Sequence, residues 1–486
     1  MKNIHEILKY VDTINLINKD IENFRNIHFD SRKVEQNDMF IAVKGTQTDG
    51  HEFINDVIAR GANVIVCENL PENPSDSCCW VVVEDSSVAL AKIADAFYNF
   101  PSKKIKLVGV TGTNGKTTIA TSLYRLVRAL GYKAGLLSTI KNLINDKEIP
   151  ATHTTSDAIT INKMLSQMLE AGCEFCFMEV SSHAIHQNRV ASLNFVGGIF
   201  TNLTHDHLDY HKTFKDYLYA KKAFFDVLPK EAFALVNADD KNAKLMLQNT
   251  KAKKLDYSTM QFADYKTKIL EHHFEGMLLK INNTEVWVKL IGKFNASNIT
   301  AIYASAIQLG FNQNEVLKYI SLLSAVEGRF ETIRSDNGIT AIVDYAHTPD
   351  ALENVLQTIT EIIDIENSII TVVGAGGNRD KTKRPIMAQI AAKYSDKLIL
   401  TSDNPRNEDP QVIINDMLEG FEDKDKNRVL TNINRKEAIR IAVMLAKSND
   451  VILVAGKGHE TYQEIEGVRH HFDDKEIINE IFKSIC

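Results

Sequence analysis

Residues 105–118 read Ile-Lys-Leu-Val-Gly-Val-Thr-Gly-Thr-Asn-Gly-Lys-Thr-Thr, and this stretch decides the fold of the central part of the chain. Its first six residues form a largely apolar run, which predicts a buried β-strand. Residues 117–130 carry apolar side chains at helical spacing, so we expect a helix there. A glycine-rich turn separates the two. A strand, a glycine turn and a helix in this order form the arrangement in which a backbone turn binds a polyphosphate.

The turn has the residue types that a phosphate-binding loop requires. Gly112 and Gly115 let the backbone bend and approach a ligand, so that successive N–H groups converge on phosphate oxygens. Lys116 would reach the outer phosphates, and the Thr117 hydroxyl is placed for Mg²⁺. The strict pattern G-x-x-x-x-G-K-[ST] is not met, because Val110 occupies the first glycine position. A glycine turn with a chance lysine is the alternative. The expected nucleotide-binding residues of this stretch are Gly112, Thr113, Asn114, Gly115, Lys116, Thr117 and Thr118.

The overall composition predicts a multidomain protein without a nucleic-acid or membrane partner. The 486 residues suggest about three domains, and 44% hydrophobic with 24% charged residues is typical of globular proteins. A net charge of −7 leaves no basic stripe for nucleic acid. The N-terminus lacks the apolar core of a signal peptide, and no run approaches the ~18 apolar residues of a membrane span. Six cysteines form no disulfide framework in so long a chain, so we expect a cytoplasmic protein, and we expect it to be a monomer.

Strands alternate with helices along almost the whole chain, which predicts the α/β class. Residues 1–100 suggest a small α/β N-terminal domain. Residues 101–331 open with the glycine turn, which favours a central P-loop domain with a mostly parallel sheet. Residues 332–486 suggest a second, Rossmann-like unit. Its segment Gly374-Ala-Gly-Gly-Asn-Arg379 resembles a dinucleotide fingerprint only superficially, because Arg379 replaces the last small residue, and we therefore discount NAD.

Polar residues at expected strand ends indicate where ligands gather, because parallel sheets bind ligands beyond the carboxyl ends of their strands. Glu179 ends an apolar run, where an unpaired charge would cost several kcal/mol. Mg²⁺ held jointly with Thr117 would compensate this charge, whereas a glutamate that simply reaches solvent is the alternative. Residues 204–211, Thr-His-Asp-His-Leu-Asp-Tyr-His, could bind a metal or a ligand. They lack a complete ligand set for zinc, and the histidines could instead be solvated loop residues.

Lys221 lies on the apolar stripe of the helix expected after this cluster. Phe214, Leu218, Phe225 and Leu228 are four, seven and three residues apart, and Lys221 divides the seven into three plus four. Burial would lower the pKa of this lysine and favour its neutral amine, which can add to CO₂. The resulting carbamate would be an anion able to hold a second Mg²⁺. A lysine that extends to the surface is the alternative, and spacing alone favours it.

Two loops of the third region suggest a pocket for a zwitterion. Asp403-Asn-Pro-Arg406 follows an expected strand, and its proline would stiffen a turn that points Arg406 at a carboxylate. Gly456-Lys-Gly-His-Glu460 follows another strand, and Glu460 could hold an ammonium group. Each loop alone could be ordinary surface polarity, but together they offer both charges that an amino acid needs.

Six motifs in this order resemble those of the Mur ligases. They are Thr111-Gly-Thr-Asn-Gly-Lys-Thr-Thr118, Met178-Glu-Val-Ser-Ser-His183, Asn202-Leu-Thr-His-Asp-His-Leu-Asp-Tyr-His211, Gly292-Lys-Phe-Asn-Ala-Ser-Asn298, Glu327-Gly-Arg329 and Asp344-Tyr-Ala-His-Thr-Pro349. The resemblance runs from Asp30-Ser-Arg32 to Gly456-Lys-Gly-His-Glu460, nearly the whole chain. It implies an N-terminal domain for the UDP end of the substrate, a central ATPase, and a Rossmann-like C-terminal domain that brings the amino acid.

The resemblance also implies roles for individual residues. Lys221 matches the carbamylated lysine of the family, which reverses the preference drawn from spacing. It and His207 would join Lys116 and Glu179 as catalytic residues, and Thr117, Glu179, His207 and the Lys221 carbamate would bind metal. Asn298, Arg329, Asp344 and His347 would contact the nucleotide. The residues implied for the UDP portion are Ser31, Thr46, Gln47 and Thr48. Those implied for the muramoyl dipeptide are Thr154, Thr155, Ser181, Gln187 and Arg189. Those implied for the amino acid are Arg379, Asp403, Asn404, Pro405, Arg406, Gly456 and Glu460.

The reaction implied by the resemblance is ATP-dependent amide formation in peptidoglycan precursor synthesis. The γ-phosphoryl group of ATP would pass to the D-glutamate γ-carboxylate of UDP-MurNAc-L-Ala-D-Glu, and an amine of meso-diaminopimelate would then attack the acyl phosphate. Lys116 and Mg²⁺ would screen the two anions. A lysine-adding enzyme or a folylpolyglutamate synthase is the alternative within this class, and Arg406 discriminates between the amine substrates. A nucleotide-gated binding module would need neither Lys221 nor Arg406.

Overall fold

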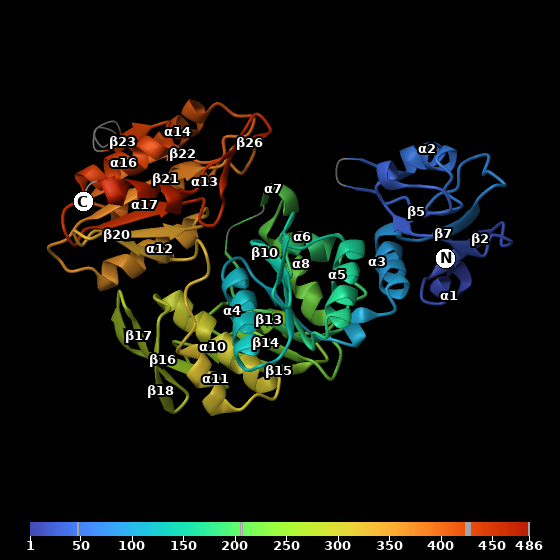
Figure 1. Ribbon diagram of the computed structural model, residues 1–486, viewed down its shortest axis with the longest axis horizontal. Helices are drawn as coiled ribbons and strands as arrows, with labels where there is room; N and C mark the ends of the chain where they lie inside the picture. Colours follow the sequence, from blue (N-terminus) through green and yellow to red (C-terminus); the bar gives the residue numbers. More distant parts are fainter. Residues whose placement is uncertain (46–47, 205, 207, 423–428, 485–486) are drawn as a thin grey trace.

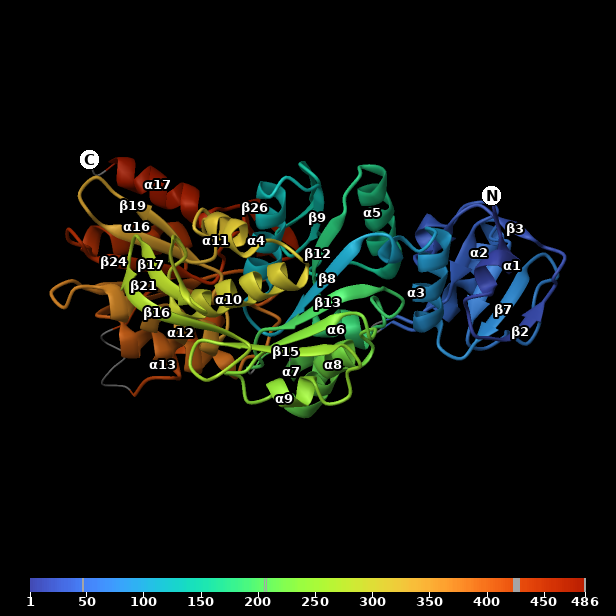
Figure 2. The ribbon, with the colours of Figure 1, turned by 90° about the horizontal axis from the view of Figure 1, so that it is seen from below.

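The computed structural model has three large β-sheets that follow one another along the long axis of the molecule, with the two chain termini at opposite ends (Figures 1 and 2). It describes residues 1–486 except 46–47, 205, 207, 423–428 and 485–486. This confirms the prediction of an α/β fold with a large, mostly parallel central sheet. Among the helices of the described residues, none is long and apolar enough to cross a membrane.

The N-terminal sheet has five strands in the order β2-β7-β6-β5-β4. The last four are mutually parallel, and β2 runs antiparallel to β7. A short pair, β1 and β3, lies beside them. Asp85 caps the longest helix of this region, α3. The bounds are β1 (Lys2–Asn3), α1 (Ile4–Leu8), β2 (Thr13–Ile17), β3 (Asn23–Phe24), β4 (Ile27–His28), β5 (Met39–Ile41), α2 (Ile54–Ala59), β6 (Val64–Cys67), β7 (Cys79–Val83) and α3 (Ser86–Phe97).

The central sheet has eleven strands in the order β11-β10-β9-β12-β8-β13-β14-β15-β16-β17-β18. The strands from β9 to β16 in this order are parallel, and antiparallel hairpins extend the sheet at both edges. The bounds are β8 (Lys106–Thr111), β9 (Ala134–Leu137), β10 (Lys141–Ile144), β11 (Lys147–Pro150), β12 (Phe175–Glu179), β13 (Phe195–Phe200), β14 (Phe233–Asn237), β15 (Lys253–Ser258), β16 (Tyr265–His273), β17 (Gly276–Ile281) and β18 (Thr284–Val288).

Helices cover both faces of the central sheet, and this explains why β8 is apolar on both sides. Val108 and Val110 join one core cluster with α4 and α10, whereas Leu107 joins another with α5 and α8. A strand buried on both faces reads as a continuous apolar run. The bounds are α4 (Lys116–Ala129), α5 (Ala158–Glu170), α6 (Ser182–His186), α7 (Leu208–His211), α8 (Phe214–Asp226), α9 (Ala243–Met246), α10 (Lys293–Gln308) and α11 (Gln313–Ile320).

The C-terminal sheet has six strands in the order β19-β20-β24-β21-β22-β23, and only β19 is antiparallel. Helices α12 to α14 pack on one face and α16 with α17 on the other. The bounds are β19 (Glu331–Arg334), β20 (Thr340–Asp344), α12 (Pro349–Ile362), β21 (Ile369–Ala375), α13 (Lys383–Tyr394), β22 (Lys397–Ser402), α14 (Pro410–Leu418), β23 (Val429–Asn432), α16 (Arg435–Leu445), β24 (Val451–Ala455), β25 (Tyr462–Ile465), β26 (Val468–His471) and α17 (Asp474–Ser484).

The two terminal regions contact the central region differently. Helix α3 packs on α5, and Ala158 of α5 belongs to the core cluster of the N-terminal sheet. Ile291 and Phe294, at the start of α10, pack with the core cluster of the C-terminal sheet, and the C-terminal region also meets the phosphate loop through polar side chains, including the Asn114 amide, which donates to Asp350 of α12 (3.0 Å). The domain limits 1–100, 101–331 and 332–486 stay predictions.

Candidate active site

The turn after β8 is held in place by the end of β13. The N–H of Thr113 donates to the carbonyl of Asn202 (2.9 Å), and the N–H of Asn114 donates to the Asn202 side chain (2.9 Å). Gly112 and Gly115 have φ values of +149° and +86°. A Cβ at Gly112 would collide with the Thr201 hydroxyl. Both glycines are therefore required by the backbone.

Two lysines, the half-buried Lys116 and the fully buried Lys221, meet at one carbonyl oxygen of this turn. Lys116 Nζ donates to the carbonyls of Gly112 (2.9 Å) and Thr113 (2.8 Å), and Lys221 Nζ donates to the same Gly112 oxygen (2.9 Å). Lys221 is 1% exposed, so the structure contradicts the alternative in which it extends to the surface. Burial first, and then the neighbouring Lys116, hold the pKa of Lys221 well below its usual range. Burial also lowers the pKa of Lys116.

Glu179 at the end of β12 is fully buried, which excludes the alternative of a glutamate that reaches solvent. Its carboxylate accepts hydrogen bonds from the N–H (2.8 Å) and the hydroxyl (3.1 Å) of Thr139. Thr117, 5% exposed, receives a hydrogen bond from Arg329 (3.3 Å). Thr117, Glu179 and Asp206 all line one cavity. Hydroxyl and carboxylate oxygens suit Mg²⁺, so these residues fit the expected ion.

The residues expected to hold the muramoyl dipeptide form one hydrogen-bonded chain. The Thr155 hydroxyl donates to the carbonyl of Glu179 (2.8 Å) and accepts from the N–H of Ser181 (3.0 Å). Arg189 donates to the carbonyl of Thr155 (2.8 Å) and to Gln187 (3.0 Å). Thr154 lies beside them, and its hydroxyl oxygen is 3.1 Å from the hydroxyl oxygen of Thr139, the residue that also bonds Glu179. This chain connects the dipeptide residues directly to Glu179.

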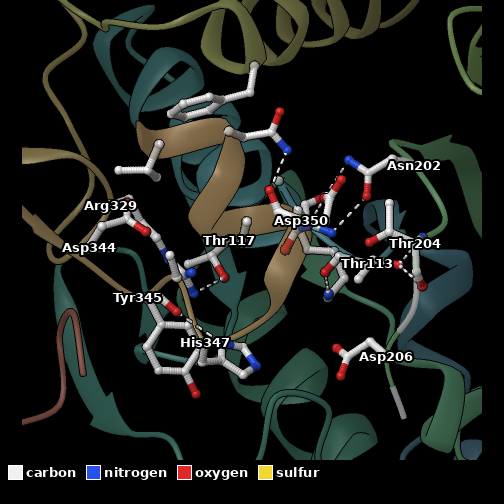
Figure 3. A pocket seen from close by; sticks show the side chains of 18 of the residues that line it. Thr113, Thr117, Asn202, Thr204, Asp206, Arg329, Asp344, Tyr345, His347 and Asp350 are labelled. Carbon is white, nitrogen blue, oxygen red and sulfur yellow. Dashed lines mark hydrogen bonds between the residues drawn. The ribbon is translucent and has the colours of Figure 1, made fainter. Parts of the chain in front are cut away.

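A cavity of about 540 Å³ extends from the phosphate loop to the C-terminal region. Figure 3 shows Arg329, Asp344, Tyr345 and His347 on one side of it and Asn202, Thr204 and Asp206 on the other. Of the expected residues, those that line it are Thr113, Asn114, Gly115, Lys116, Thr117, Thr118, Thr154, Glu179, Asn298, Arg329, Asp344, His347, Arg379, Asp403, Asn404, Arg406, Gly456 and Glu460. The cavity therefore brings together groups from the central and C-terminal sheets.

The expected nucleotide contacts from the C-terminal side surround one aromatic ring. The Arg329 guanidinium lies over the ring of Tyr345, 4.4 Å from its centroid. Asp344 accepts from the N–H of Phe330 (2.7 Å), and burial raises the pKa of Asp344 to about 6. Burial, followed by Lys383, lowers the pKa of His347 to about 4, so this ring is neutral near pH 7.

The far end of the cavity is built from the two loops that suggested an amino-acid pocket. The Asn404 amide donates to Glu460 (2.7 Å), and Arg406 donates to the carbonyl of Gly377 (2.7 Å). Pro405 is buried, and Arg406 has a φ of +53°. The hairpin β25–β26 holds this turn, because the N–H of Arg406 donates to the carbonyl of Glu464 (3.0 Å). Burial and the neighbouring Asp403 raise the pKa of Glu460.

Several expected residues lie apart from the cavity or outside the described chain. Ser31 stands in a short turn capped by Asp30 in the N-terminal region, and Thr48 is exposed in a loop of the same region. Thr46, Gln47 and His207 lie outside the described residues. Most residues expected for the nucleotide and the amino acid thus line one cavity together with Thr154, whereas the expected UDP contacts lie in a separate region. The cavity lining does not include Gly112, Thr155, Ser181, Gln187, Arg189, Lys221 and Pro405.

Sequence reasoning missed several residues that line the cavity or support it. Asp350, from α12, lines the cavity and is bonded to the phosphate loop. The Tyr210 hydroxyl accepts from Gln187 (2.9 Å), yet no role was expected for it within its motif. Other such lining residues are Thr139, Asp206, Asp239, Thr259, Met260, Phe294, Ser297, Tyr345 and Lys383. Their only sequence signal was proximity to a strand end or to a recognised motif, as for Asp239 two residues after β14.

Three segments of the chain match models of one family. Residues 23–98 match the Mur ligase family, catalytic domain, residues 110–306 the Mur ligase middle domain, and residues 328–458 the Mur ligase, glutamate ligase domain. A solved structure named as a UDP-N-acetylmuramoyl-L-alanyl-D-glutamate–2,6-diaminopimelate ligase is 31% identical, with a TM-score of 0.69 over 100% of this chain and 99% of the other. A MurF from Acinetobacter baumannii, 16% identical over 99% of this chain and 98% of its own, has a TM-score of 0.66 and shares the fold.

Curated relatives match over nearly the full length and carry one name, UDP-N-acetylmuramoyl-L-alanyl-D-glutamate–2,6-diaminopimelate ligase. The protein from Phocaeicola vulgatus is 57% identical and that from Bacteroides thetaiotaomicron 56% identical, each over 479 residues and 99% of both chains. The protein from Clostridioides difficile is 41% identical over 98% of this chain and 99% of its own. Together with the six motifs and the cavity they surround, these matches confirm the resemblance drawn from the sequence: the chain belongs to the Mur ligase family.

Proposed function

We propose that this protein is an ATP-dependent ligase that joins meso-diaminopimelate to the D-glutamate γ-carboxylate of UDP-MurNAc-L-Ala-D-Glu, in peptidoglycan precursor synthesis. One observation carries the proposal. A single cavity has a phosphate-binding turn at one end and, at the other, the side chains of Arg406, Asp403 and Glu460, which suit a zwitterion. The names of relatives 55–57% identical over 99% of this chain support the same substrates.

The nucleotide end would activate the acid. A carboxylate is a poor electrophile, so the γ-phosphoryl group is transferred to it and gives an acyl phosphate with ADP as leaving group. Lys116 and the N–H groups of the turn would neutralise charge on the phosphates, and Thr117 and Glu179 would hold Mg²⁺. Bound Mg²⁺ would screen the repulsion between the carboxylate and the γ-phosphate. The chain of Thr155, Gln187 and Arg189 would hold the dipeptide next to these groups.

Lys221 would contribute as a carbamate. Its lowered pKa favours the neutral amine, whose nitrogen lone pair forms a bond to the carbon of CO₂ while one proton is released to solvent. The ammonium form of the lysine thus loses two protons in all, one to become the reacting amine and one on addition of CO₂, and the product carries one negative charge. That change would remove the repulsion from Lys116 and supply oxygen ligands for a second Mg²⁺. His207, which lies outside the described residues, stays a proposed metal ligand.

The C-terminal region would bring the amine to the activated acid. Arg406 and Arg379 would bind a carboxylate of diaminopimelate, and Glu460 would hold an ammonium group. The free amine attacks the acyl carbon, and phosphate leaves from the tetrahedral intermediate with the loss of one amine proton. Arg329, Asp344 and His347 would contact the nucleotide as this region closes and excludes water. Identical small-angle scattering profiles with and without ATP analogue and dipeptide substrate would contradict closure.

We also propose the three domain limits given above, with Ser31 and residues 46–48 of the N-terminal domain at the UDP portion. We further propose a cytoplasmic monomer. The five described cysteines are free and buried, which supports a reducing compartment. Sedimentation of the purified protein would test the monomer.

An amine panel tests the proposed function. Purified protein would be given ATP, Mg²⁺ and UDP-MurNAc-L-Ala-D-Glu with meso-diaminopimelate, L-lysine or L-glutamate, and phosphate release and product mass would be measured. We expect phosphate release that requires both the dipeptide and diaminopimelate, and a product heavier by one diaminopimelate residue. Preference for lysine would show the alternative ligase. ATP consumption without the dipeptide, or without amide product, would overturn the proposal.

A further inference from the structure

Lys457 is a fully buried lysine beside the amino-acid end of the cavity, and the function proposed above assigns it nothing. It lies in the loop after β24, between Gly456 and Gly458, which have φ values of +114° and +54°. A Cβ at Gly456 would collide with Asp403, and one at Gly458 with Tyr345. Both glycines let the loop pack so tightly that the Lys457 side chain points behind the pocket.

The ammonium group of Lys457 contacts the side chains that face the cavity. Its Nζ is 3.1 Å from Asn404 Oδ1, 3.3 Å from Glu460 Oε2 and 4.0 Å from Asp403 Oδ1. Asn404 in turn donates to the same Glu460 oxygen (2.7 Å). Asp403, Asn404 and Glu460 line the cavity. Lys457 therefore holds from behind the three groups that would meet an amino acid from the front.

The charges of this cluster explain why a cation is needed there. Burial and the negative charge of Asp403 both raise the pKa of Glu460, and the positive charge of Lys457 opposes them. The charge of a second buried cation, Arg435, also interacts with Asp403 and Glu460, but its hydrogen bonds go to Asp474 (2.8 and 2.7 Å) and to the carbonyl of Ala455 (3.0 Å). Without Lys457, Asp403 and Glu460 would share a desolvated site in which no other described residue forms an ion pair with them, and one of the two would take up a proton.

We propose that Lys457 is a positioning residue for amine binding, which keeps the negative charges of Asp403 and Glu460 directed at the cavity so that they receive an ammonium group of the incoming amino acid. This inference rests on the proposed function. It differs from a purely structural role for the lysine in one respect. A structural role would affect all substrates alike, whereas this role affects the amino acid alone.

The test is the steady-state kinetics of Lys457→Met, which keeps the length of the side chain and removes its charge. The KM for diaminopimelate should rise at least about tenfold, because hydrogen bonds to charged groups contribute that much or more. The KM values for ATP and for the UDP-dipeptide should stay within about twofold of the wild type, the usual range for a distant substitution. The kcat at saturating diaminopimelate should be largely retained.

Two further variants make the result decisive. Lys397→Met is the matched control, because Lys397 lies half-buried on β22 of the same sheet and donates to the carbonyl of Leu445 (2.9 Å). It should leave every constant unchanged. Lys457→Gln can still donate hydrogen bonds to Asn404 and Glu460 but carries no charge. It should also raise the KM for diaminopimelate, and it replaces the methionine variant if that variant does not fold.

The outcomes separate this inference from the proposed function. If the wild-type protein adds no diaminopimelate, the proposed function fails. If the wild type is active and either folded variant keeps the wild-type KM for diaminopimelate, the role of Lys457 is wrong. Equal losses for all three substrates, or a loss in kcat alone, would show a structural role and would also overturn the inference.

Discussion

Lysine side chains at the two ends of the cavity have different kinds of partner. At the nucleotide end, Lys116 and Lys221 both donate to the carbonyl oxygen of Gly112. At the amino-acid end, Lys457 contacts Glu460 and lies near Asp403. The hydrogen bonds of Lys116 and Lys221 thus go to backbone carbonyls, with the charges of Glu179 and Asp206 nearby, whereas Lys457 forms a direct ion pair with Glu460.

The different partners of these lysines indicate which ligand charges each end of the cavity favours. A carbonyl dipole compensates a buried ammonium only in part, and two ammonium groups at one oxygen repel each other. The nucleotide end therefore favours incoming anions, which are the phosphates of ATP and, at Lys221, a carbamate. The amino-acid end contains its own compensating charges and favours a ligand that brings both signs.

The largest effect is expected for Lys221→Ala. Loss of a charged group next to the transferred phosphoryl group should lower kcat about 10²–10³-fold. Because a free carboxylate could replace the carbamate, acetate or formate should restore part of the rate. Phosphate release with all three substrates measures the effect, and full activity of the variant in CO₂-free buffer would contradict the proposed role.

Lys222→Ala provides the matched control for this experiment. Lys222 is the next residue of α8, is 3% exposed and is paired with Asp226 (2.7 Å). It is adjacent to Lys221, has the same residue type and is similarly buried, but it forms an ion pair with Asp226. We expect near wild-type kcat for this variant. A comparable loss would mean that any cavity in α8 stops catalysis, and the contrast between the two ends would lose its support.

The next largest effect is expected at the other end, for Arg406→Ala. The guanidinium would bind a carboxylate that lysine lacks, so the KM for diaminopimelate should rise about 30-fold to 100-fold. The rate with lysine as the amine should change little, so the preference between the two substrates narrows. Arg440→Ala, which removes a surface arginine paired with Glu437, serves as control. An unchanged preference would place the selectivity elsewhere.

The sequence predicted the class of fold well because local signals carried it. The apolar run before the glycine turn and the alternation of strands and helices required no knowledge of distant contacts. The phosphate loop and the loops around Arg406 and Glu460 were singled out because each follows a strand end, and all three line one cavity, but their roles stay predictions. Lys221 shows where this reasoning stops. Spacing placed it on an apolar stripe, but only the family resemblance and the structure indicated burial.

Other residues of the site were invisible to the sequence because their partners are far away in the chain. Lys457 contacts Asn404, 53 residues earlier, and Asp350 accepts from Asn114, 236 residues earlier. No periodicity reports such pairs. Tyr210 was quoted within a motif, yet its hydrogen bond to Gln187 depends on how α7 lies beside α6. These positions are fixed by packing between elements, which local patterns do not encode.

Replacing Lys221 and Lys457 by methionine should change the free energy of unfolding in opposite directions. Lys221→Met removes a buried ammonium group that donates to the Gly112 carbonyl, lies 4.8 Å from the centroid of the Tyr217 ring, and is repelled by Lys116 more strongly than it is attracted by Asp206. The variant should therefore stabilise the central region by about 1–2 kcal/mol in CO₂-free buffer. Lys457→Met leaves two carboxylates without their cation and should destabilise the C-terminal region by about 3 kcal/mol. Thermal melting of both variants measures the signs, and equal destabilisation would remove the contrast.

The stabilisation expected for Lys221→Met should depend on pH, because the pKa of Lys221 in the folded protein lies well below its usual range. The folded state binds fewer protons than the unfolded state, whose lysine has a pKa of about 10.4. The penalty in wild type is therefore greatest at low pH and disappears as the pH rises toward the unfolded pKa. The stabilisation by methionine should shrink in the same direction. A difference that stays constant between neutral and alkaline pH would show that packing, not charge, is responsible.

The smallest effect is expected for Asp350→Asn, which tests whether the nucleotide end is tuned for anions throughout. Asp350 lines the cavity beside the phosphate loop (Figure 3). Its carboxylate would repel the triphosphate, so the asparagine variant should bind ATP about threefold more tightly by calorimetry. The control is Asp364→Asn, at an exposed residue two positions after α12, which should leave ATP binding unchanged.

Burial raises the pKa of Asp350, so the wild-type carboxyl gains its proton at a higher pH than an ordinary aspartate. The difference between variant and wild type should therefore narrow as the pH falls, because a protonated Asp350 no longer repels phosphate. Weaker ATP binding by the variant would show that the hydrogen bond to Asn114 matters more than the charge.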